Sequence, residues 1–161
     1  MKQYYYYDFP VGRFYIAESD GAVTDVVNRP VEGAELNETP LISRAAEMLW
    51  EYFSGRRKNF DGLPLFFEGT EFQKKAWNAL LAIPYGETRT YKEQAEAIGN
   101  VKACRAVGAA NGKNPISIIV PCHRVIGSDK SLVGYGGGLE VKAALLELES
   151  GRDSLWPEQQ E

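Results

Sequence analysis

The sequence predicts a fold of the α/β class, more narrowly α+β. A small three-stranded antiparallel sheet with one helix, over residues 1–68, precedes a mainly helical helix-turn-helix part, over residues 69–161. Three observations support this expectation. Short β-prone runs broken by turn residues fill the first thirty positions, apolar residues recur at helical spacing in residues 41–53, and two helix-capping sequences occur in the second half. A chain of 161 residues accommodates one domain or two small ones that share an interface.

The first thirty residues predict an antiparallel meander, because aromatic and β-branched residues alternate there with turn formers. The runs are residues 4–9, 14–17 and 22–27, and the separators are Pro10, Gly12, Asp20 and Gly21. Four consecutive tyrosines begin the first run. Successive side chains of a strand point to opposite faces, so we expect these rings to pack on the sheet rather than to form a platform for stacked bases.

A single helix is expected after the meander. Leu41, Ala45 and Leu49 recur at helical spacing, and Gly55 has the character of a C-terminal cap. The polar residues 28–40 before this helix and the Gly- and Pro-containing residues 59–69 after it are predicted to be loops.

Two capping-box sequences predict helix starts at Thr70 and Thr90. The second helix should stop at Gly99, and after a tight turn a third should run from about Lys102 to Gly112. A helix, a tight glycine-containing turn and a helix form the helix-turn-helix pattern, although many helical pairs share this spacing. Beyond this pair we expect a short apolar strand (residues 116–120), a glycine-rich loop (residues 134–138) and a last helix that includes residues 145–149.

The composition argues against several classes of protein. No apolar run approaches the roughly 20 residues that span a bilayer, and the N-terminus lacks the pattern of a secretory signal. Two cysteines cannot build a disulfide framework, which favours a reducing, cytoplasmic compartment. Two cysteines and one histidine also make a poor zinc site, so we expect neither a metal nor another cofactor.

The charge distribution allows a nucleic-acid partner although the net charge is −4. Residues 1–69 carry 7 basic and 11 acidic side chains, whereas residues 70–150 carry 10 basic and 8 acidic ones. Residues 99–130 hold five basic side chains and one acidic one. Such a local basic surface predicts modest, salt-sensitive binding to a phosphate backbone.

Cys122 is the candidate nucleophile, since it adjoins the only histidine, His123. A thiol reacts as its thiolate, and His123 and Arg124 are the local groups that could lower its pKa. A Cys-His pair alone would more often be structural, as Cys104 is expected to be. A protease-like site would normally bring its histidine from a distant segment, so thiol hydrolysis is disfavoured. Adjacent side chains diverge in a strand, and their contact requires a turn or a bridging water.

Residues 119–126, Ile-Val-Pro-Cys-His-Arg-Val-Ile, closely resemble the active-site signature of the O6-alkylguanine-DNA alkyltransferases, or methylated-DNA–protein-cysteine methyltransferases. The resemblance extends in register over about residues 69–150, and residues 1–68 match more loosely. The matching features are the helix from Thr70, Tyr91, Ala-Cys-Arg-Ala-Val-Gly at 103–108, Gly112, Asn114-Pro115, Gly-Tyr-Gly-Gly-Gly at 134–138, and Leu145-Leu146 before Glu149.

The resemblance implies an irreversible, single-turnover transfer of a methyl or other alkyl group from O6 of guanine in DNA to Cys122, with O4 of thymine as a further candidate. Glu149 would orient His123, which would act on the thiol through a water. The Tyr91 hydroxyl would donate to guanine N3. The main-chain carbonyls of Cys122 and Val125 would accept from the guanine amino group. Asn114 would support the turn that holds the cysteine.

The resemblance also implies how DNA is held. A monomer would bind the minor groove of double-stranded DNA and rotate the damaged base out of the stack. Arg105 would fill the vacated space on a helix whose small residues, among them Ala106 and Gly108, permit close approach. The loop with Tyr135, Gly136 and Gly137 would close over the base. Some family members have serine where this chain has Gly136, so a backbone N–H would replace that hydroxyl. The zinc ligands of some relatives are not available in this chain.

Three alternatives remain at this point. A module that recognises alkylated DNA without transfer would lack the cysteine. A transcriptional regulator would be expected to show a dimerisation segment. A cysteine hydrolase would need a differently placed histidine.

Overall fold

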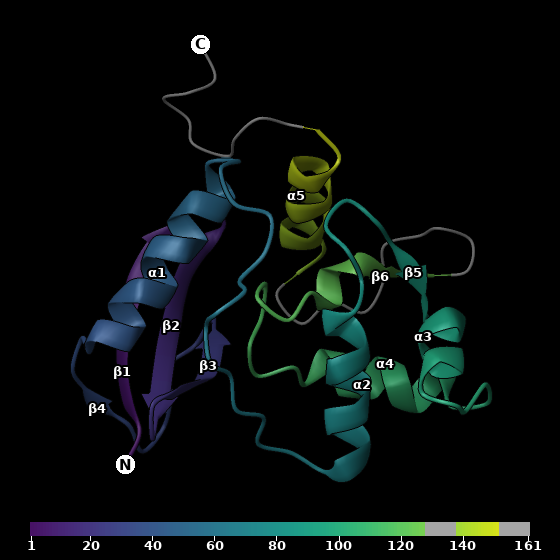
Figure 1. The fold of residues 1–161 in the computed structure, drawn as a ribbon, viewed down its shortest axis with the longest axis horizontal. Coiled ribbons are helices and arrows are strands. Elements are labelled where there is room, and N and C mark those ends of the chain that lie inside the picture. Colours follow the sequence, from purple (N-terminus) through teal and green to yellow (C-terminus); the bar gives the residue numbers. More distant parts are fainter. Residues whose placement is uncertain (128–137, 152–161) are drawn as a thin grey trace.

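The computed structural model describes residues 1–127 and 138–151, and its N-terminal part is built on the predicted meander (Figure 1). The strands are β1 (Gln3–Phe9), β2 (Gly12–Ser19) and β3 (Ala22–Val27), each antiparallel to the next. Asp20 and Gly21, between β2 and β3, both have positive φ (52° and 79°). A two-residue hairpin turn of the type that matches the strand twist requires this conformation, and Asp-Gly adopts it readily. The three-stranded meander is therefore confirmed.

A fourth strand extends the sheet. Residues Glu35–Leu36 form β4, which pairs in parallel with β1 and gives the sheet order β3-β2-β1-β4. Residues 28–40 are predicted to be a loop, and this prediction is wrong for β4. Two exposed residues carry no alternating pattern, and only the neighbouring β1 edge determines their pairing.

Helix α1 (Pro40–Phe53) runs alongside the sheet and contacts β1, β2 and β3. The Thr39 side chain accepts a hydrogen bond from the Ile42 amide, and Pro40 occupies the first helical position. Beyond the C-cap, Gly55 adopts a φ of 78°, the left-handed conformation that glycine supplies at helix ends.

The C-terminal part contains α2 (Glu71–Leu81), α3 (Tyr91–Ala97) and α4 (Cys104–Gly112). Both predicted capping boxes are present, at Thr70 and at Thr90. Helices α3 and α4 pack together and form the helix-turn-helix pair at the right of Figure 1. The local signals therefore predicted these helix starts correctly.

The strand predicted for residues 116–120 is wrong. These residues form isolated bridges, Val26 with Ile116 and Ser117 with Val120, around a turn in which Ile118 has a φ of 71°. The apolar run indicated burial, which the structure confirms for Ile116 and Ile118, but burial alone does not distinguish a strand from a packed loop.

The buried turn leads directly to the next elements. A short 3-10 helix, Cys122–Arg124, precedes β6 (Val125–Ile126), which pairs in parallel with β5 (Arg89–Thr90) just before α3. The last described helix is α5 (Leu139–Glu149).

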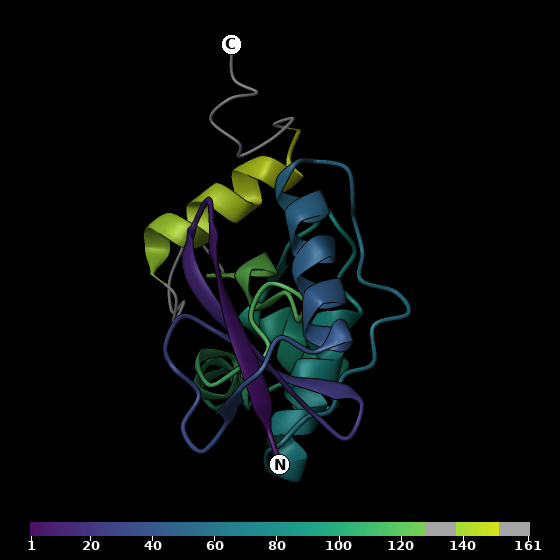
Figure 2. The ribbon, with the colours of Figure 1, turned by 90° about the vertical axis from the view of Figure 1, so that its left-hand side faces the viewer.

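One apolar cluster joins the two parts of the chain. It includes Phe53 from α1, Trp77 from α2 and Leu145 from α5, all at most 1% exposed. Seen with the sheet toward the viewer, the helices of the C-terminal part lie behind the strands (Figure 2). Helix α5 therefore lies close both to α1 and to the turn at residues 122–124. Among the described helices, none is long and apolar enough to cross a membrane.

Candidate active site

Cys122 begins the 3-10 helix and is held by its backbone and by Asn114. Its amide donates to the Val120 carbonyl at 2.8 Å. The Asn114 side-chain amide donates to the same carbonyl at 2.8 Å and to the Cys122 sulfur at 3.3 Å, while its Oδ1 accepts from the Ile116 amide at 3.0 Å. Asn114 thus closes the turn onto the thiol.

The Cys122 thiol is neutral at neutral pH. Cys122 is only 7% exposed, and burial raises its pKa above the usual value of 9.0, against the opposing effects of the Asn114 hydrogen bond and the Lys142 ammonium. A base is therefore needed to take its proton when it reacts.

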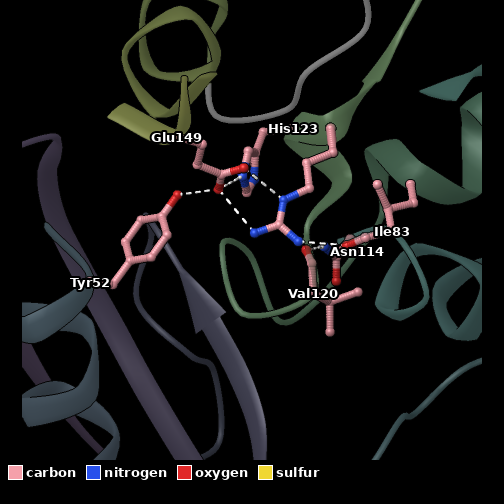
Figure 3. A network of polar contacts seen from close by, with 7 residues as sticks. Tyr52, Ile83, Asn114, Val120, His123 and Glu149 are labelled. Carbon is pink, nitrogen blue, oxygen red and sulfur yellow. Dashed lines mark hydrogen bonds and ion pairs between the residues drawn. The ribbon is translucent and has the colours of Figure 1, made fainter. Parts of the chain in front are cut away.

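The His123 side chain points toward Glu149 of α5. Its Nε2 lies 2.7 Å from Oε2 of Glu149, and both side chains are buried (Figure 3). Adjacent side chains diverge in an extended strand, but residues 122–124 form a 3-10 turn, so this argument against contact between Cys122 and His123 does not apply.

The Glu149 carboxylate accepts hydrogen bonds from two other elements, the 3-10 helix and α1. Arg124 donates through Nε to Oε1 at 2.7 Å and through Nη2 to Oε2 at 3.1 Å. The Tyr52 hydroxyl donates to Oε2 at 2.5 Å. Burial alone would raise the pKa of Glu149, but His123 and Arg124 outweigh it and lower the pKa to about 2.

The ionised carboxylate determines the tautomer of His123. A carboxylate only accepts hydrogen bonds, so the proton of neutral imidazole must lie on Nε2. Nδ1 then carries the lone pair, and it is buried without a hydrogen-bond partner among the residues that the structure describes. Burial lowers the pKa of His123 below 6.5, so the ring is neutral at neutral pH and Nδ1 is available as a base.

Tyr91, the first residue of α3, lies near Cys122. Burial raises the pKa of its hydroxyl, and the neighbouring Cys122 adds to the effect, so Tyr91 remains a hydrogen-bond donor. Gly108 of α4 packs against its ring, where an added Cβ would stand 3.7 Å from Tyr91 Cε1. The ammonium of Lys142 lies 6.0 Å from the centre of the same ring.

The two carbonyls expected to face guanine already take part in hydrogen bonds. The Cys122 carbonyl accepts from the Val125 amide, and the Val125 carbonyl accepts from Lys142 Nζ at 2.5 Å. Each carbonyl oxygen has a second lone pair, which a further donor could use.

Helix α4 divides its residues between two faces. Val107 and Ala110 are buried, and the Ala110 carbonyl accepts from the Trp77 indole at 2.8 Å. Arg105, Ala106 and Ala109 are exposed, as are Lys102 and Lys113 at either end. The outer face therefore combines basic side chains with small ones. Tyr135, Gly136 and Gly137 lie outside the described residues.

The sequence does not predict the contacts that three further residues make at the candidate site. Arg124 was considered as a group acting on the thiol, but its guanidinium binds Glu149 and the Ile83 carbonyl. Lys142 is buried in α5, and its helical spacing to Leu145 and Glu149 was the available signal. Tyr52 lies in an apolar helical pattern, which gives no indication of a polar role.

Comparison with known proteins identifies the family of this chain. The family model described as 6-O-methylguanine DNA methyltransferase, DNA binding domain, matches residues 71–151, and the model for the ribonuclease-like domain of the same methyltransferase matches residues 2–67. The chain belongs to the 6-O-methylguanine DNA methyltransferase family. Within the part described, no group of three or more His, Cys, Asp or Glu side chains could hold a metal ion.

Members of this methyltransferase family match over nearly the whole chain. A methylated-DNA–protein-cysteine methyltransferase of Mycobacterium bovis is 47% identical over 157 residues, covering 94% of each chain. The constitutive one of Bacillus subtilis is 45% identical, covering 92% of this chain and 96% of the relative. The solved structure of Mycobacterium tuberculosis OGT in complex with DNA matches with a TM-score of 0.86 and 46% identity, covering 94% of this chain and 95% of the other. The predicted α+β fold is confirmed by this match.

Proposed function

We propose that this protein repairs DNA by transferring an alkyl group from O6 of guanine, with O4 of thymine as a further candidate, to the sulfur of Cys122. The observation that carries the proposal is the arrangement at Cys122. A buried thiol held by Asn114 lies beside a histidine whose tautomer is fixed by Glu149. Membership of the family and the names of the relatives support the same reaction.

The reaction is a displacement at the alkyl carbon. The thiol proton passes through a water to Nδ1 of His123, and the sulfur attacks the alkyl carbon. The bond between that carbon and O6 breaks, and its electron pair stays with guanine. Tyr91 donates a hydrogen bond to the purine at N3 as this charge develops. The product thioether is a poor leaving group, so each molecule reacts once and needs no cofactor.

Double-stranded DNA is the proposed partner, bound through its minor groove by the exposed face of α4. The target base rotates out, at a cost of a few kcal/mol, and Arg105 occupies the space it leaves. The exposed alanines at 106 and 109 allow the close approach that such binding needs. We further propose a monomer that acts in the cytoplasm, in keeping with two free cysteines.

Intact mass after incubation with a duplex containing O6-methylguanine tests the proposal. One methyl increment per molecule, located on Cys122 and without turnover, is expected. Cys122→Ala should bind the duplex and show no increment, while Cys104→Ala should react as the native protein does. Tight binding of the damaged duplex by the native protein with unchanged mass would instead identify a recognition module.

A further inference from the structure

Tyr52 lies at the reaction centre although it belongs to α1, in the N-terminal part of the chain. Its hydroxyl donates to Oε2 of Glu149 at 2.5 Å, across 97 positions of sequence. Figure 3 shows the ring extending from α1 toward the carboxylate, which descends from α5. Tyr52 is fully buried and Glu149 is 6% exposed, so solvent does not weaken the contact.

The hydroxyl binds the same oxygen that orients His123. Oε2 receives Nε2 of His123 at 2.7 Å and Nη2 of Arg124 at 3.1 Å, and the Tyr52 donor is the shortest of the three. Arg124 is itself anchored to the Ile83 carbonyl at 2.7 Å, so its guanidinium holds the carboxylate from that side. The position of Oε2 relative to His123 therefore depends on the contacts with both Arg124 and Tyr52.

The ring of Tyr52 is fixed by its surroundings. It packs against Phe53 at 5.4 Å, Phe60 at 5.7 Å and Tyr85 at 6.2 Å between ring centres. Burial, reinforced by the charge of Glu149, raises the pKa of Tyr52 well above 10.0, so the hydroxyl keeps its proton at neutral pH and remains a donor. A rigid, always protonated hydroxyl is suited to positioning an acceptor.

We propose that Tyr52 is a positioning residue for alkyl transfer, which acts by holding Oε2 of Glu149 at the place that orients His123. The N-terminal part of the chain thereby contributes to the rate of the chemical step. The inference rests on the proposed relay from Cys122 through His123 to Glu149. A tyrosine that served only the core would contribute stability and leave the relay unchanged.

Tyr52→Phe tests the proposal, because it removes one oxygen and retains the packed ring. Single-turnover transfer at saturating protein and pH 7 should slow by about tenfold, less than the roughly hundredfold or more expected for loss of a general base. The deficit should shrink as the pH passes the raised pKa of Cys122, which lies above 9.0, because the thiolate then forms without help. The control is Tyr7→Phe, which removes a hydroxyl that binds Glu38 in the same sheet-bearing part and should leave the rate unchanged.

A second background separates positioning from core packing. In Glu149→Gln the relay is already broken, so adding Tyr52→Phe should cause little further slowing. Unchanged transfer by a folded Tyr52→Phe protein, or equal slowing in both backgrounds, would overturn the proposal. If Glu149→Gln alone reacts as fast as the native protein, the relay in the proposed function is wrong. If Glu149→Gln is slow and Tyr52→Phe is not, only the role of Tyr52 fails. Melting temperatures identify loss of fold, and the pH profile of Tyr52→Phe alone decides the matter if the double variant does not fold.

Discussion

At the scale of single residues, burial gives Cys122 and His123 complementary protonation states. It raises the pKa of the thiol and lowers that of the imidazole, so both are neutral at neutral pH. A neutral pair in a buried site avoids the cost of two charges until the substrate arrives. Glu149, with a pKa of about 2, is the permanent charge of this group, and Arg124 compensates it.

These protonation states predict the pH dependence of transfer. The native rate should fall only as the pH drops through the lowered pKa of His123, below 6.5. In His123→Ala the rate should be about a hundredfold lower at pH 7 and should rise about tenfold per pH unit, because it then follows the thiolate fraction. Single-turnover rates between pH 5.5 and 9, measured at saturating protein, check this expectation. Parallel profiles for the two proteins would show that His123 is not the base.

At the scale of elements, α4 has one face that packs into the protein and one face that is exposed. Its inner face contacts α2 and α3, and its outer face carries Arg105 between exposed small residues. The turn before Cys122 is the second decisive element. Ile118 adopts a φ of 71°, which costs a branched residue strain, and the buried surroundings hold it there. The chain is thereby directed to place the thiol at the start of the 3-10 helix.

The position of Arg105 predicts a defect confined to duplex substrates. Arg105→Ala should slow transfer from a duplex strongly at saturating protein, because in the proposed binding mode Arg105 fills the space that the rotated base leaves. Transfer from free O6-alkylguanine requires no opening and should change much less.

The comparison of both substrates distinguishes three roles for Arg105. If Arg105 contacts only phosphate, the defect should disappear at saturation and should appear as weaker, more salt-sensitive binding. Equal losses on both substrates, with a lower melting temperature, would mean that the residue supports the fold.

At the scale of the whole molecule, the candidate active site draws on both the N-terminal and the C-terminal part of the chain. Tyr52 comes from α1, Cys122 and His123 from the turn after α4, and Glu149 from the end of α5. The shared apolar cluster holds these elements together. The contacts that hold these elements together therefore also determine the geometry of the candidate site.

The buried Glu149 and His123 predict how the stability of the fold responds to acid. The pKa of Glu149 is lowered from 4.5 to about 2, so its stabilising contribution is complete above pH 4.5 and is lost as the pH falls toward 2. The shift corresponds to about 3 kcal/mol of unfolding free energy. Buried neutral His123 acts in the same direction below pH 6.5. Denaturant unfolding at a series of pH values measures the loss. Glu149→Gln should start less stable at pH 7 and lose less between pH 4.5 and 2, and an equally steep loss in this variant would assign the effect to other groups.

The sequence by itself determined the elements that depend on near neighbours. Thr70 and Thr90 specify their helix starts through side chains three residues away, and Asp20-Gly21 specifies its hairpin through its own backbone preference. The signature around Cys122 likewise lies within one short segment, which is why the family could be inferred before the fold was known.

Only the tertiary structure decided the contacts that join distant segments. It replaced the expected strand at residues 116–120 by a buried turn, paired β4 with β1, and brought Tyr52, Arg124 and His123 to one carboxylate. The sequence pattern around Tyr52 indicates an apolar helix face, and nothing within its neighbourhood distinguishes a core tyrosine from one that binds a glutamate 97 positions away. Local preferences act over a few residues, whereas these contacts depend on how the whole core packs.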